Sequence, residues 1–425
     1  MKDYTSGWVG VAAAFIDHKR KKKELKAIQD ANEANQGIVR YQPSQVEAFF
    51  NESDPLQNMF FSGGDPILRI RAMTRAAECG LIQGYTVLAL HCGNGILEQA
   101  LNKYFGSGVV ATVNRANPIY DPFVGATKND ITRLTIASST KTCQINAAGR
   151  YYLNGITDFI QAKGINPYIQ MYITCPHMTL LDKVNDAEAK GQISANLARA
   201  ITSQIMQGEV EKGNIEAFFA ALSRQADSIL AQKRDLNRAV NLQLAARNQQ
   251  ILCVDVLSDT NGYLINLLVN EVDGLLSQGN RVMLILDEIS ISANNVLSGF
   301  VKHSSTNCSM VVSADDVFSQ LGGSDTDFFS FAGKCSKIII SKHASAYSCQ
   351  KLSDTIGSYD KQEINTTYGA NTNFVSTWGY GTTNTSAISI KRENIVKPEE
   401  IQRMNTDEVY IIDKLSGELS FTQVV

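Results

Sequence analysis

Short apolar runs alternate with amphipathic segments along much of the chain. Residues 86–90 read TVLAL and lie between Gly84 and Gly93, which is typical of a buried strand. A glycine turn, a helical pattern over residues 96–105 and a second apolar run over residues 109–113 follow. Because a strand, a turn, a helix and another strand make up the repeating unit of a parallel sheet, this order predicts an α/β fold.

The same alternation returns in the second half of the chain. It predicts strands at residues 251–256, 282–286, 309–313, 337–341 and 409–413, and helices at residues 261–278, 296–303 and 347–356. Residues 168–173 are predicted to form a further strand, and residues 129–164 are predicted to be mostly helical. Residues 357–387 are rich in Ser, Thr, Asn, Gly and Tyr, which predicts a mobile loop or an irregular hairpin.

A long helix-favouring stretch separates the two parts of the predicted sheet. Residues 179–248 contain no proline, and apolar residues recur three or four positions apart within them. About 70 residues is more than one crossover needs, so we expect an inserted all-α subdomain; a set of ordinary crossover helices is the alternative. The expected organisation is an N-terminal segment (1–50), a first sheet part (51–178), the helical insertion (179–248) and a second sheet part (249–425).

The N-terminal segment combines an apolar run with a basic run. Residues 8–16 are apolar, but they are about half of the roughly 20 residues that span a bilayer. The basic run HKRKKK (18–23) follows them, and a signal peptide has the opposite order. Two interpretations stay open: the start of a solvated helix, or the stub of a membrane anchor with its cytoplasmic basic flank.

Composition and charge limit the possible environments and partners. Apolar residues make up 44% and charged residues 19% of the 425 residues, which is ordinary for a globular protein. The net charge of −3 gives no general attraction to nucleic acid, so a DNA contact would need a local basic patch or a symmetric pore. The eight cysteines include no CxxC pair, which argues against a zinc site or a disulfide framework and favours a reducing cytosol.

The clearest candidate for chemistry is residues 281–288, RVMLILDE, an apolar strand that ends in two acids. The carboxyl edge of a parallel sheet is where open α/β sheets bind ligands. In P-loop ATPases an aspartate in the place of Asp287 holds Mg²⁺, and a glutamate in the place of Glu288 polarises the attacking water. The alternative is a buried strand that ends in a solvated acidic pair.

The phosphate-binding loop that should accompany these acids has the pattern GxxxxGK[ST]. The loop after the strand at residues 86–90 contains Gly93, Asn94 and Gly95, but Ile96 then stands at the lysine position and Leu97 at the Ser/Thr position. No GK[ST] sequence occurs anywhere in the chain. A charged donor in such a site contributes several kcal/mol, so we do not expect this chain alone to hydrolyse ATP efficiently. A tight turn without a ligand is the alternative.

Three other positions lie near predicted strand ends. Asp315 and Asp316, followed by Gln320, come after the strand that ends at Ser313, where a side chain can sense a γ-phosphate. A solvated loop is the alternative. His91 and His177 are isolated and are interpreted as structural residues.

In their order along the chain these segments resemble the coupling-protein ATPases of conjugative type IV secretion. The resemblance is carried by LILDEIS (284–290), SADDVFSQL (313–321), AYSCQKLSDTIG (346–357) and VKPEEIQRMNTDEVYII (396–412). It implies a RecA-like P-loop NTPase-type sheet with an inserted all-α subdomain, with ATP and Mg²⁺ as cofactors. It also carries over Asp287 and Glu288 as the acidic pair. The glutamine of that family falls near Asp315 or Asp316, where an aspartate would repel a γ-phosphate.

The resemblance further implies a homo- or hetero-hexamer at the inner face of a bacterial membrane, under a secretion channel, with single-stranded DNA and relaxase or effector substrates. The lost lysine favours a member that recruits substrate with impaired or absent hydrolysis, that is, a pseudo-ATPase. The alternative is an active DNA-translocating ATPase with an atypical phosphate loop or with residues from a neighbouring subunit. A third hypothesis is an unrelated nucleotide-dependent enzyme on the same sheet.

Overall fold

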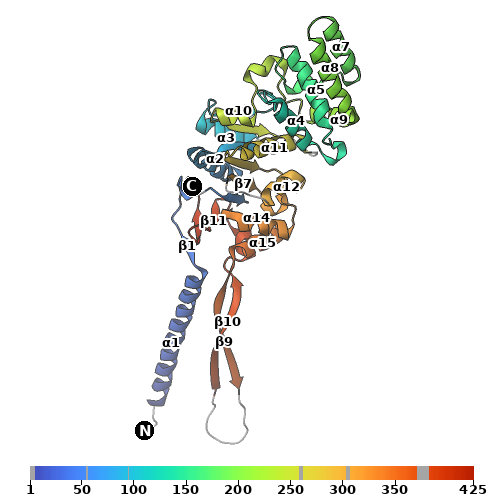
Figure 1. Ribbon diagram of the computed structural model, residues 1–425. Helices are drawn as coiled ribbons and strands as arrows, with labels where there is room; N and C mark the ends of the chain where they lie inside the picture. Colours follow the sequence, from blue (N-terminus) through green and yellow to red (C-terminus); the bar gives the residue numbers. More distant parts are fainter. Residues whose placement is uncertain (1–4, 54–55, 94, 258–261, 303–306, 371–381) are drawn as a thin grey trace.

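The protein is built on a ten-stranded sheet, formed within residues 5–53, 56–93, 95–257, 262–302, 307–370 and 382–425, which the computed structural model describes (Figure 1). The strand order is β1-β12-β11-β8-β2-β7-β6-β3-β5-β4. The strands are β1 (Ile38–Arg40), β2 (Asn58–Ser62), β3 (Thr86–His91), β4 (Val110–Val113), β5 (Ile251–Asp255), β6 (Val282–Asp287), β7 (Cys308–Ala314), β8 (Cys335–Ile340), β11 (Glu408–Asp413) and β12 (Glu418–Gln423). Strands β2 to β8 pair in parallel, which confirms the expected α/β fold.

Helices cover both faces of the sheet because its central strands are apolar on both sides. On one face, α2 (Pro66–Ile82) and α3 (Gly95–Phe105) pack against strand residues such as Val87. On the other face, α11 (Tyr263–Ser277) packs against residues such as Leu88. Burying each side chain of this size stabilises the fold by about 1.5–3 kcal/mol, so the two apolar layers hold the carboxyl edge of the sheet in place.

The other helices are α1 (Thr5–Gln36), α4 (Lys128–Ser138), α5 (Gly149–Ala162), α6 (Ile169–Ile173), α7 (Leu180–Ala189), α8 (Ala195–Gln207), α9 (Lys212–Ala226), α10 (Leu242–Arg247), α12 (Asn295–Lys302), α13 (Val317–Gln320), α14 (Asp325–Lys334), α15 (Ala346–Ile356) and α16 (Pro398–Arg403). Short 3-10 turns lie at Val46–Phe49, Lys141–Cys143, His177–Thr179, Glu209–Glu211 and Lys233–Arg238. The helices expected at residues 96–105 and 347–356 are thereby confirmed. Those expected at residues 261–278 and 296–303 are confirmed over their described residues, and residues 261 and 303 lie outside the described part.

The strand expected at residues 168–173 is wrong, because this segment forms the single helical turn α6. Its first amide, the N–H of Ile169, donates to Oδ2 of the buried Asp121 at 3.0 Å. Tyr172 then packs edge-on against Phe123, with ring centroids 4.9 Å apart. A carboxylate that caps the first turn and an aromatic anchor in that turn stabilise a helix here, although the apolar spacing alone also fits a strand.

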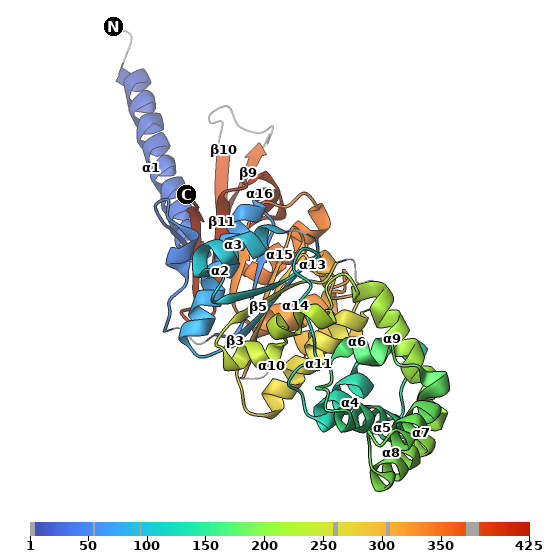
Figure 2. The same cartoon turned by 90° about the horizontal axis from the view of Figure 1, so that it is seen from above.

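Helices α4 to α9 project from one end of the sheet domain as a helical body, whereas α10 packs on the sheet domain near β3 and β5 (Figures 1 and 2). The boundary expected at residues 178/179 falls within the 3-10 turn His177–Thr179, inside this body. Helices α5 and α8, on either side of that boundary, pack closely: a Cβ on Gly155 would lie 2.7 Å from the side chain of Ile205.

Two prongs extend from the opposite end of the sheet domain (Figure 1). One is α1, and the other is the hairpin of β9 (Ser358–Ala370) and β10 (Thr382–Asn394). Residues 357–387, expected as a mobile loop or an irregular hairpin, thus contribute to a hairpin, and residues 371–381 lie outside the described part. Within the described residues, none of the helices combines the length and the apolar character needed to cross a bilayer.

Candidate functional site

A row of polar side chains crosses neighbouring strands at the carboxyl edge of the parallel sheet. In register, Asp255 of β5 lies beside His91 of β3, His91 beside Asp287 of β6, and Asp287 beside Ser313 of β7. Side chains in register on neighbouring strands point to the same face, so this row forms one polar surface. Since open α/β sheets bind ligands at this edge, the row marks the candidate site.

Asp287 is buried within this row. The hydroxyl of Ser313 donates to its Oδ1 at 3.3 Å, whereas its Oδ2 has no hydrogen-bond partner in the described part of the chain. Burial raises the pKa of Asp287 to about 6, and the neighbouring Glu288 carboxylate adds to the rise. Oδ2 is therefore suited to be one oxygen ligand of a hard cation such as Mg²⁺. Across the described residues, no three His, Cys, Asp or Glu side chains are grouped so that they could hold a metal ion by themselves.

Glu288 is held by protein groups on both carboxylate oxygens. Its backbone is left-handed (φ 54°), and its N–H donates to the carbonyl of Ser313 at 2.9 Å. Its Oε1 accepts from Nη2 of Arg69 at 2.7 Å and from the N–H of Asp315 at 2.9 Å. Its Oε2 accepts from Nε2 of Gln320 at 3.4 Å. Burial raises the pKa of Glu288, and the charge of Arg69 opposes that rise.

Arg69, from the first turns of α2, is the cation of this site. Its side chain is 3% exposed, and Nη2 also lies 2.6 Å from Oδ1 of Asp315. Its Nη1 donates to the backbone carbonyls of Gly63 and Gly64, each at 3.2 Å. The guanidinium thus ties the loop between β2 and α2 to the acidic ends of β6 and β7.

The β2–α2 loop donates its backbone N–H groups to carbonyls of neighbouring segments, at Ala314, Lys342 and Thr406. The N–H groups of Gly63, Gly64 and Asp65 donate to protein carbonyls at 3.0, 3.0 and 3.2 Å. Asp65 is the N-cap of α2, and its Oδ1 accepts from the N–H of Ile67 at 2.8 Å. Gly63 and Gly64 have φ of 83° and 73°, and a Cβ on Gly63 would lie 2.4 Å from a backbone oxygen. The N–H donors of this loop are therefore occupied by carbonyls of neighbouring segments, and the loop packs tightly against them.

The sequence analysis missed this loop, although a signal was present. Residues 63–70 read GGDPILRI. Against GxxxxGK[ST], Gly63 stands at the first glycine, Leu68 at the second, Arg69 at the lysine and Ile70 at the Ser/Thr. A glycine at the first position and a basic residue at the lysine position are present, but the second glycine and the Ser/Thr are missing. The sequence alone therefore does not identify this loop. Strand β2, which positions the loop, was not predicted either.

The turn after β3, predicted to be the phosphate loop, is joined to the end of β5. The N–H of Gly93 donates to Oδ1 of Asp255 at 2.9 Å, and Gly93 has φ of 65°. Gly95 starts α3, Leu97 is buried and Ile96 is 44% exposed. Asn94 lies outside the described residues. The assignment of Gly93 and Gly95 to phosphate binding stays a prediction.

The two residues predicted to sense a γ-phosphate have different surroundings. Asp316 is the N-cap of α13: its Oδ1 accepts from the N–H of Ser319 at 3.2 Å, and its Oδ2 accepts from the hydroxyl of Ser348 at 2.6 Å. Gln320, at the end of α13, contacts Glu288 as described. The structure thus brings Gln320 to the acidic pair and gives Asp316 a capping role.

The two isolated histidines are both buried. Burial lowers the pKa of His91, so the imidazole is neutral beside Asp287, and neither of its ring nitrogens has a hydrogen-bond partner in the region described. Burial also lowers the pKa of His177, whose Nδ1 lies 3.2 Å from the hydroxyl of Tyr152 in the helical body.

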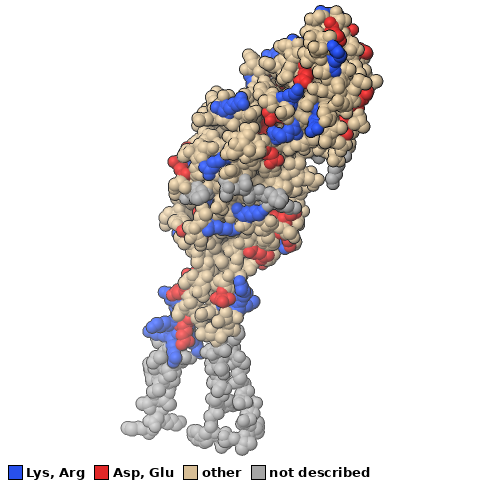
Figure 3. All heavy atoms as spheres, in the orientation of Figure 1, with Lys and Arg blue, Asp and Glu red and all other residues tan. Residues whose placement is uncertain are grey.

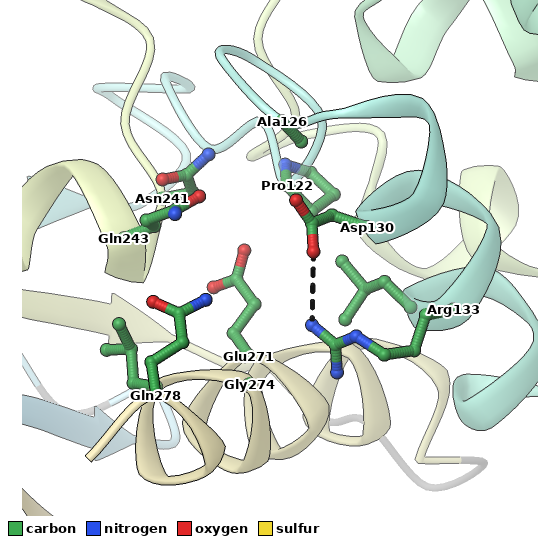
Figure 4. Close-up of a pocket in the computed structure, with 11 residues that line it drawn as sticks. Pro122, Ala126, Asp130, Arg133, Asn241, Gln243, Glu271, Gly274 and Gln278 are labelled. Carbon is green, nitrogen blue, oxygen red and sulfur yellow. Dashed lines mark ion pairs between the residues drawn. The ribbon is translucent and has the colours of Figure 1, made fainter. Parts of the chain in front are cut away.

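A cavity of about 40 Å³ lies where the helical body joins the sheet domain (Figure 4). Glu271 of α11 points into it, and its Oε2 accepts from the N–H of Leu242 at 3.2 Å. Burial raises the pKa of Glu271 to about 8. Across the cavity, Arg133 lies 3.9 Å from Asp130 and over Gly274, where a Cβ would be 2.6 Å from its Nη2. The cavity has room for about one or two water molecules and for no nucleotide.

Comparison with known proteins identifies the fold. No family model and no curated protein matches the sequence. Among solved structures, the chain is similar to "Bacterial conjugative coupling protein TrwBdeltaN70" in its unbound monoclinic form, with a TM-score of 0.50, 14% identity, and coverage of 89% of this chain and 90% of that chain. It is also similar to the plasmid coupling protein TrwB in complex with the non-hydrolysable GTP analogue GDPNP, with a TM-score of 0.50, 13% identity, and coverage of 92% and 91%. The likeness shows a RecA-like fold, as expected.

Proposed function

We propose that the chain is a coupling-protein-like component of a conjugative type IV secretion machine that recruits its substrate without hydrolysing ATP. The observation that carries this proposal is the β2–α2 loop, where the amides that could hold a phosphate already donate to protein acceptors. The likeness in fold to TrwB over most of both chains supports the choice of machine.

The electrostatics of the loop oppose a nucleotide. The positive end of a helix favours an anion, but at α2 that position is taken by the carboxylate of Asp65. Arg69, at the position of the missing lysine, already neutralises Glu288. A phosphate would have to displace the Asp65 cap and break the ion pair between Arg69, which is 3% exposed, and Glu288, which is 27% exposed. Breaking a buried pair costs about 3–5 kcal/mol, so this partly buried pair lies at the lower end of that range. We therefore expect an affinity for Mg-ATP weaker than millimolar.

In this proposal the acidic pair, Asp287 and Glu288, has a structural role. Glu288 orders the loops after β2 and β7 through Arg69, Asp315 and Gln320. Asp287 could provide one ligand to Mg²⁺, but Mg²⁺ in nucleotide sites takes further ligands from the phosphates, which this loop does not bind.

The alternative function is an active DNA-translocating ATPase. It is favoured by the unpartnered Oδ2 of Asp287 and by the retained Glu288, which would activate water. Nucleotide would then bind at Gly93 to Gly95, or at a site completed by a neighbouring subunit in a homo- or hetero-hexamer. Asp316 and Gln320 would be its sensors.

In the proposed function, the helical body and the sheet domain contact single-stranded DNA with its relaxase, or effector substrates. The two prongs face the inner side of a bacterial membrane and its secretion channel, on the cytoplasmic side. The cofactors ATP and Mg²⁺ are not needed for this role.

Isothermal titration with Mg-ATP tests the proposal. We expect no saturable heat up to about 1 mM nucleotide. Micromolar affinity would overturn it. In transfer assays, Asp287→Asn is the most selective variant, because it removes the cation ligand and leaves the contacts between Arg69 and Glu288 in place. We expect transfer to be nearly unchanged for Asp287→Asn, and a large drop would favour the active ATPase.

A further inference from the structure

We infer that the outer edge of β4 binds an extended, uncharged peptide segment of a partner protein as one more strand of the sheet. The groove along this edge lies between α3, on one face of the sheet, and α10, on the other. The inference goes beyond the proposed function, because it concerns the last strand of the sheet and depends neither on a nucleotide nor on a secretion machine.

Strand β4 ends the sheet and pairs with β5 alone among the described strands. The N–H of Ile251 in β5 donates to the carbonyl of Val109 at 2.8 Å. In a parallel pair alternate residues direct their backbone groups to the partner strand, so every second residue from Val109 onward faces β5. The backbone groups of Val110 and Thr112 therefore face away from the sheet.

The chain itself occupies the two outermost of these backbone groups. The N–H of Val110 donates to the carbonyl of Gly106 at 3.2 Å, and the carbonyl of Thr112 accepts from Nδ2 of Asn117 at 2.6 Å. The carbonyl of Val110 and the N–H of Thr112, which lie between them, face the groove. One residue of an added strand satisfies both, since its N–H donates to Val110 and its carbonyl accepts from Thr112.

The groove along this edge has a volume of about 600 Å³, within the range of about 300–1,000 Å³ that is usual for ligand sites. Its apolar lining includes Val110, Ile119 and Val240. Leu97 of α3 and Leu242 of α10 belong to the apolar layers on opposite faces of the sheet (Figure 2). Because successive side chains of a strand point to opposite faces, those of an added strand lie alternately against the two helices.

Hydrogen bonds fix both walls of the groove to β4 and to the loops beside it. On the α3 side, Nδ2 of Asn102 donates to the hydroxyl of Thr112 at 2.9 Å. On the α10 side, the N–H of Val240 donates to the carbonyl of Ile119 at 2.9 Å, and Nε2 of Gln250 donates to the loop before β4 at 3.0 Å. The groove is therefore formed before a ligand arrives, which lowers the entropy that binding costs.

Two amide side chains on the α10 side of the groove carry free donors and acceptors. Asn237 and Asn248 line the groove and are exposed, and within the described residues their side-chain amides bond to no other protein group. An amide side chain is uncharged and offers both donors and an acceptor, as a peptide group does. These two residues can therefore bond the main chain of an extended peptide whatever its sequence.

The charges of the groove distinguish a peptide from a nucleic acid. Among the lining residues, all of which the structure describes, Glu98 is the acid and Arg238 the base, and none is aromatic. Glu98 accepts from Nδ2 of Asn114 at 2.8 and 2.9 Å, and Arg238 donates to Asp235 at 3.1 Å. On the face shown in Figure 3, the Lys and Arg side chains of the sheet domain lie in separate patches. A single-stranded nucleic acid needs a basic track and aromatic side chains for stacking, so the groove fits an uncharged peptide instead.

Selection of ten-residue peptides from a random phage library against the full chain tests the inference. We expect enriched peptides with uncharged runs, and their affinity is then measured by fluorescence polarisation. The test variant is Thr112→Pro, which removes the outward N–H and places the proline ring in the groove. Because this N–H faces away from β5, the sheet keeps its own hydrogen bonds. We expect the affinity for the selected peptides to fall by about 10-fold or more, since one hydrogen bond is lost and a peptide carbonyl is left unpaired.

The matched control is Thr112→Val, which keeps the N–H and the branched shape and removes only the hydroxyl that accepts from Asn102. It should bind the peptides like the wild type. A second measurement needs no variant: saturating peptide should slow hydrogen exchange in residues 110–113 of the wild type, because the amide of Thr112 becomes bonded. Failure to enrich any peptide, equal losses of affinity in the two variants, wild-type affinity of Thr112→Pro, or unchanged exchange would each overturn the inference.

Two other occupants of the groove are outcomes of the same experiments. If a single-stranded oligonucleotide displaces the peptide and binds Thr112→Pro more weakly than the wild type, the groove belongs to a nucleic acid. If the wild type forms a concentration-dependent assembly in sedimentation velocity that Thr112→Pro abolishes, the occupant is a second copy of the chain. Either result overturns the assignment to a partner peptide. None of these measurements involves Mg-ATP, so failure here is distinct from failure in the Mg-ATP titration.

Discussion

Replacing Arg69 by methionine is the most direct perturbation of the candidate site. It keeps the length and the apolar stem of the side chain and removes the guanidinium that joins the β2–α2 loop to Glu288 and Asp315. If the ion pair has replaced the nucleotide as the group that orders this edge, its loss should destabilise the whole sheet domain.

The expected magnitude follows from the burial of each partner. Removing one member of a buried ion pair costs about 3–5 kcal/mol. Asp315 is 76% exposed and adds little. Glu288 is 27% exposed and keeps two other donors, the N–H of Asp315 and the side chain of Gln320. The cost of Arg69→Met is therefore expected at the lower end of the range, about 3 kcal/mol or less. For a chain of 425 residues that corresponds to a fall in thermal midpoint of roughly 3 °C.

A double-mutant cycle with Glu288→Gln isolates the pair. We expect the double variant to be less destabilised than the sum of the single variants by about 2 kcal/mol, measured by calorimetry or denaturant unfolding. The matched control is Arg71–Glu47, an ion pair at 2.7 Å with side chains 31% and 35% exposed, whose coupling should stay below about 1 kcal/mol. Coupling between Arg69 and Glu288 no larger than that of the control would refute the reasoning.

Three further predictions concern titration and backbone geometry. Burial raises the pKa of Asp287 to about 6, so the stability that this shift contributes is complete below the unfolded pKa near 4 and is lost as the pH rises through 6. Asp287→Asn should therefore raise the thermal midpoint more at pH 8 than at pH 4. An equal effect at both pH values would contradict burial as the cause. The pKa of Glu271 is raised to about 8, so Glu271→Gln should stabilise the protein at pH 9 relative to pH 5, and a larger gain at pH 5 would exclude the assigned shift. Gly63→Ala places a Cβ 2.4 Å from the carbonyl oxygen of Lys342 at φ 83° and should cost about 3 kcal/mol or more of stability. The control Gly84→Ala, with φ 77° and open space around the Cβ, should cost about 1–2 kcal/mol. Equal losses of stability in denaturant unfolding would show that the positive φ alone, and not the close contact, sets the cost.

The sheet was predictable where the strands are long and apolar on both faces. Strands β3, β5 and β6 each form a continuous apolar run between turn residues, which is the pattern that the interior of a parallel sheet requires. The position of Asp287 and Glu288 at the end of β6 follows directly from that pattern. The contact between Gln320 and Glu288 also fits the expectation that side chains after neighbouring strands meet at one edge.

The rest depended on contacts that are distant in sequence. Strand β2 is short and pairs with β7 and β8, about 250 or more residues later, so nothing near it in the chain indicates that it is a strand. The role of Arg69 follows only from that pairing, because β2 places the start of α2 opposite the acidic pair. The turn α6 was mistaken for a strand because the carboxylate that caps it, Asp121, comes from a different part of the chain.

The early start of α2 has a consequence for attempts to rebuild nucleotide binding by mutation. Helix α2 begins at Pro66, which has no N–H, and by Arg69 the amide is already bonded to the carbonyl of Asp65 at 3.2 Å. Changing Arg69 to lysine and Ile70 to serine would restore two letters of a motif on a backbone that has already become helix. If the loop binds no nucleotide, as proposed, restoring binding would require the main chain from Gly63 to Leu68 to be unwound and replaced as a unit, and we expect no single substitution in this loop to achieve it.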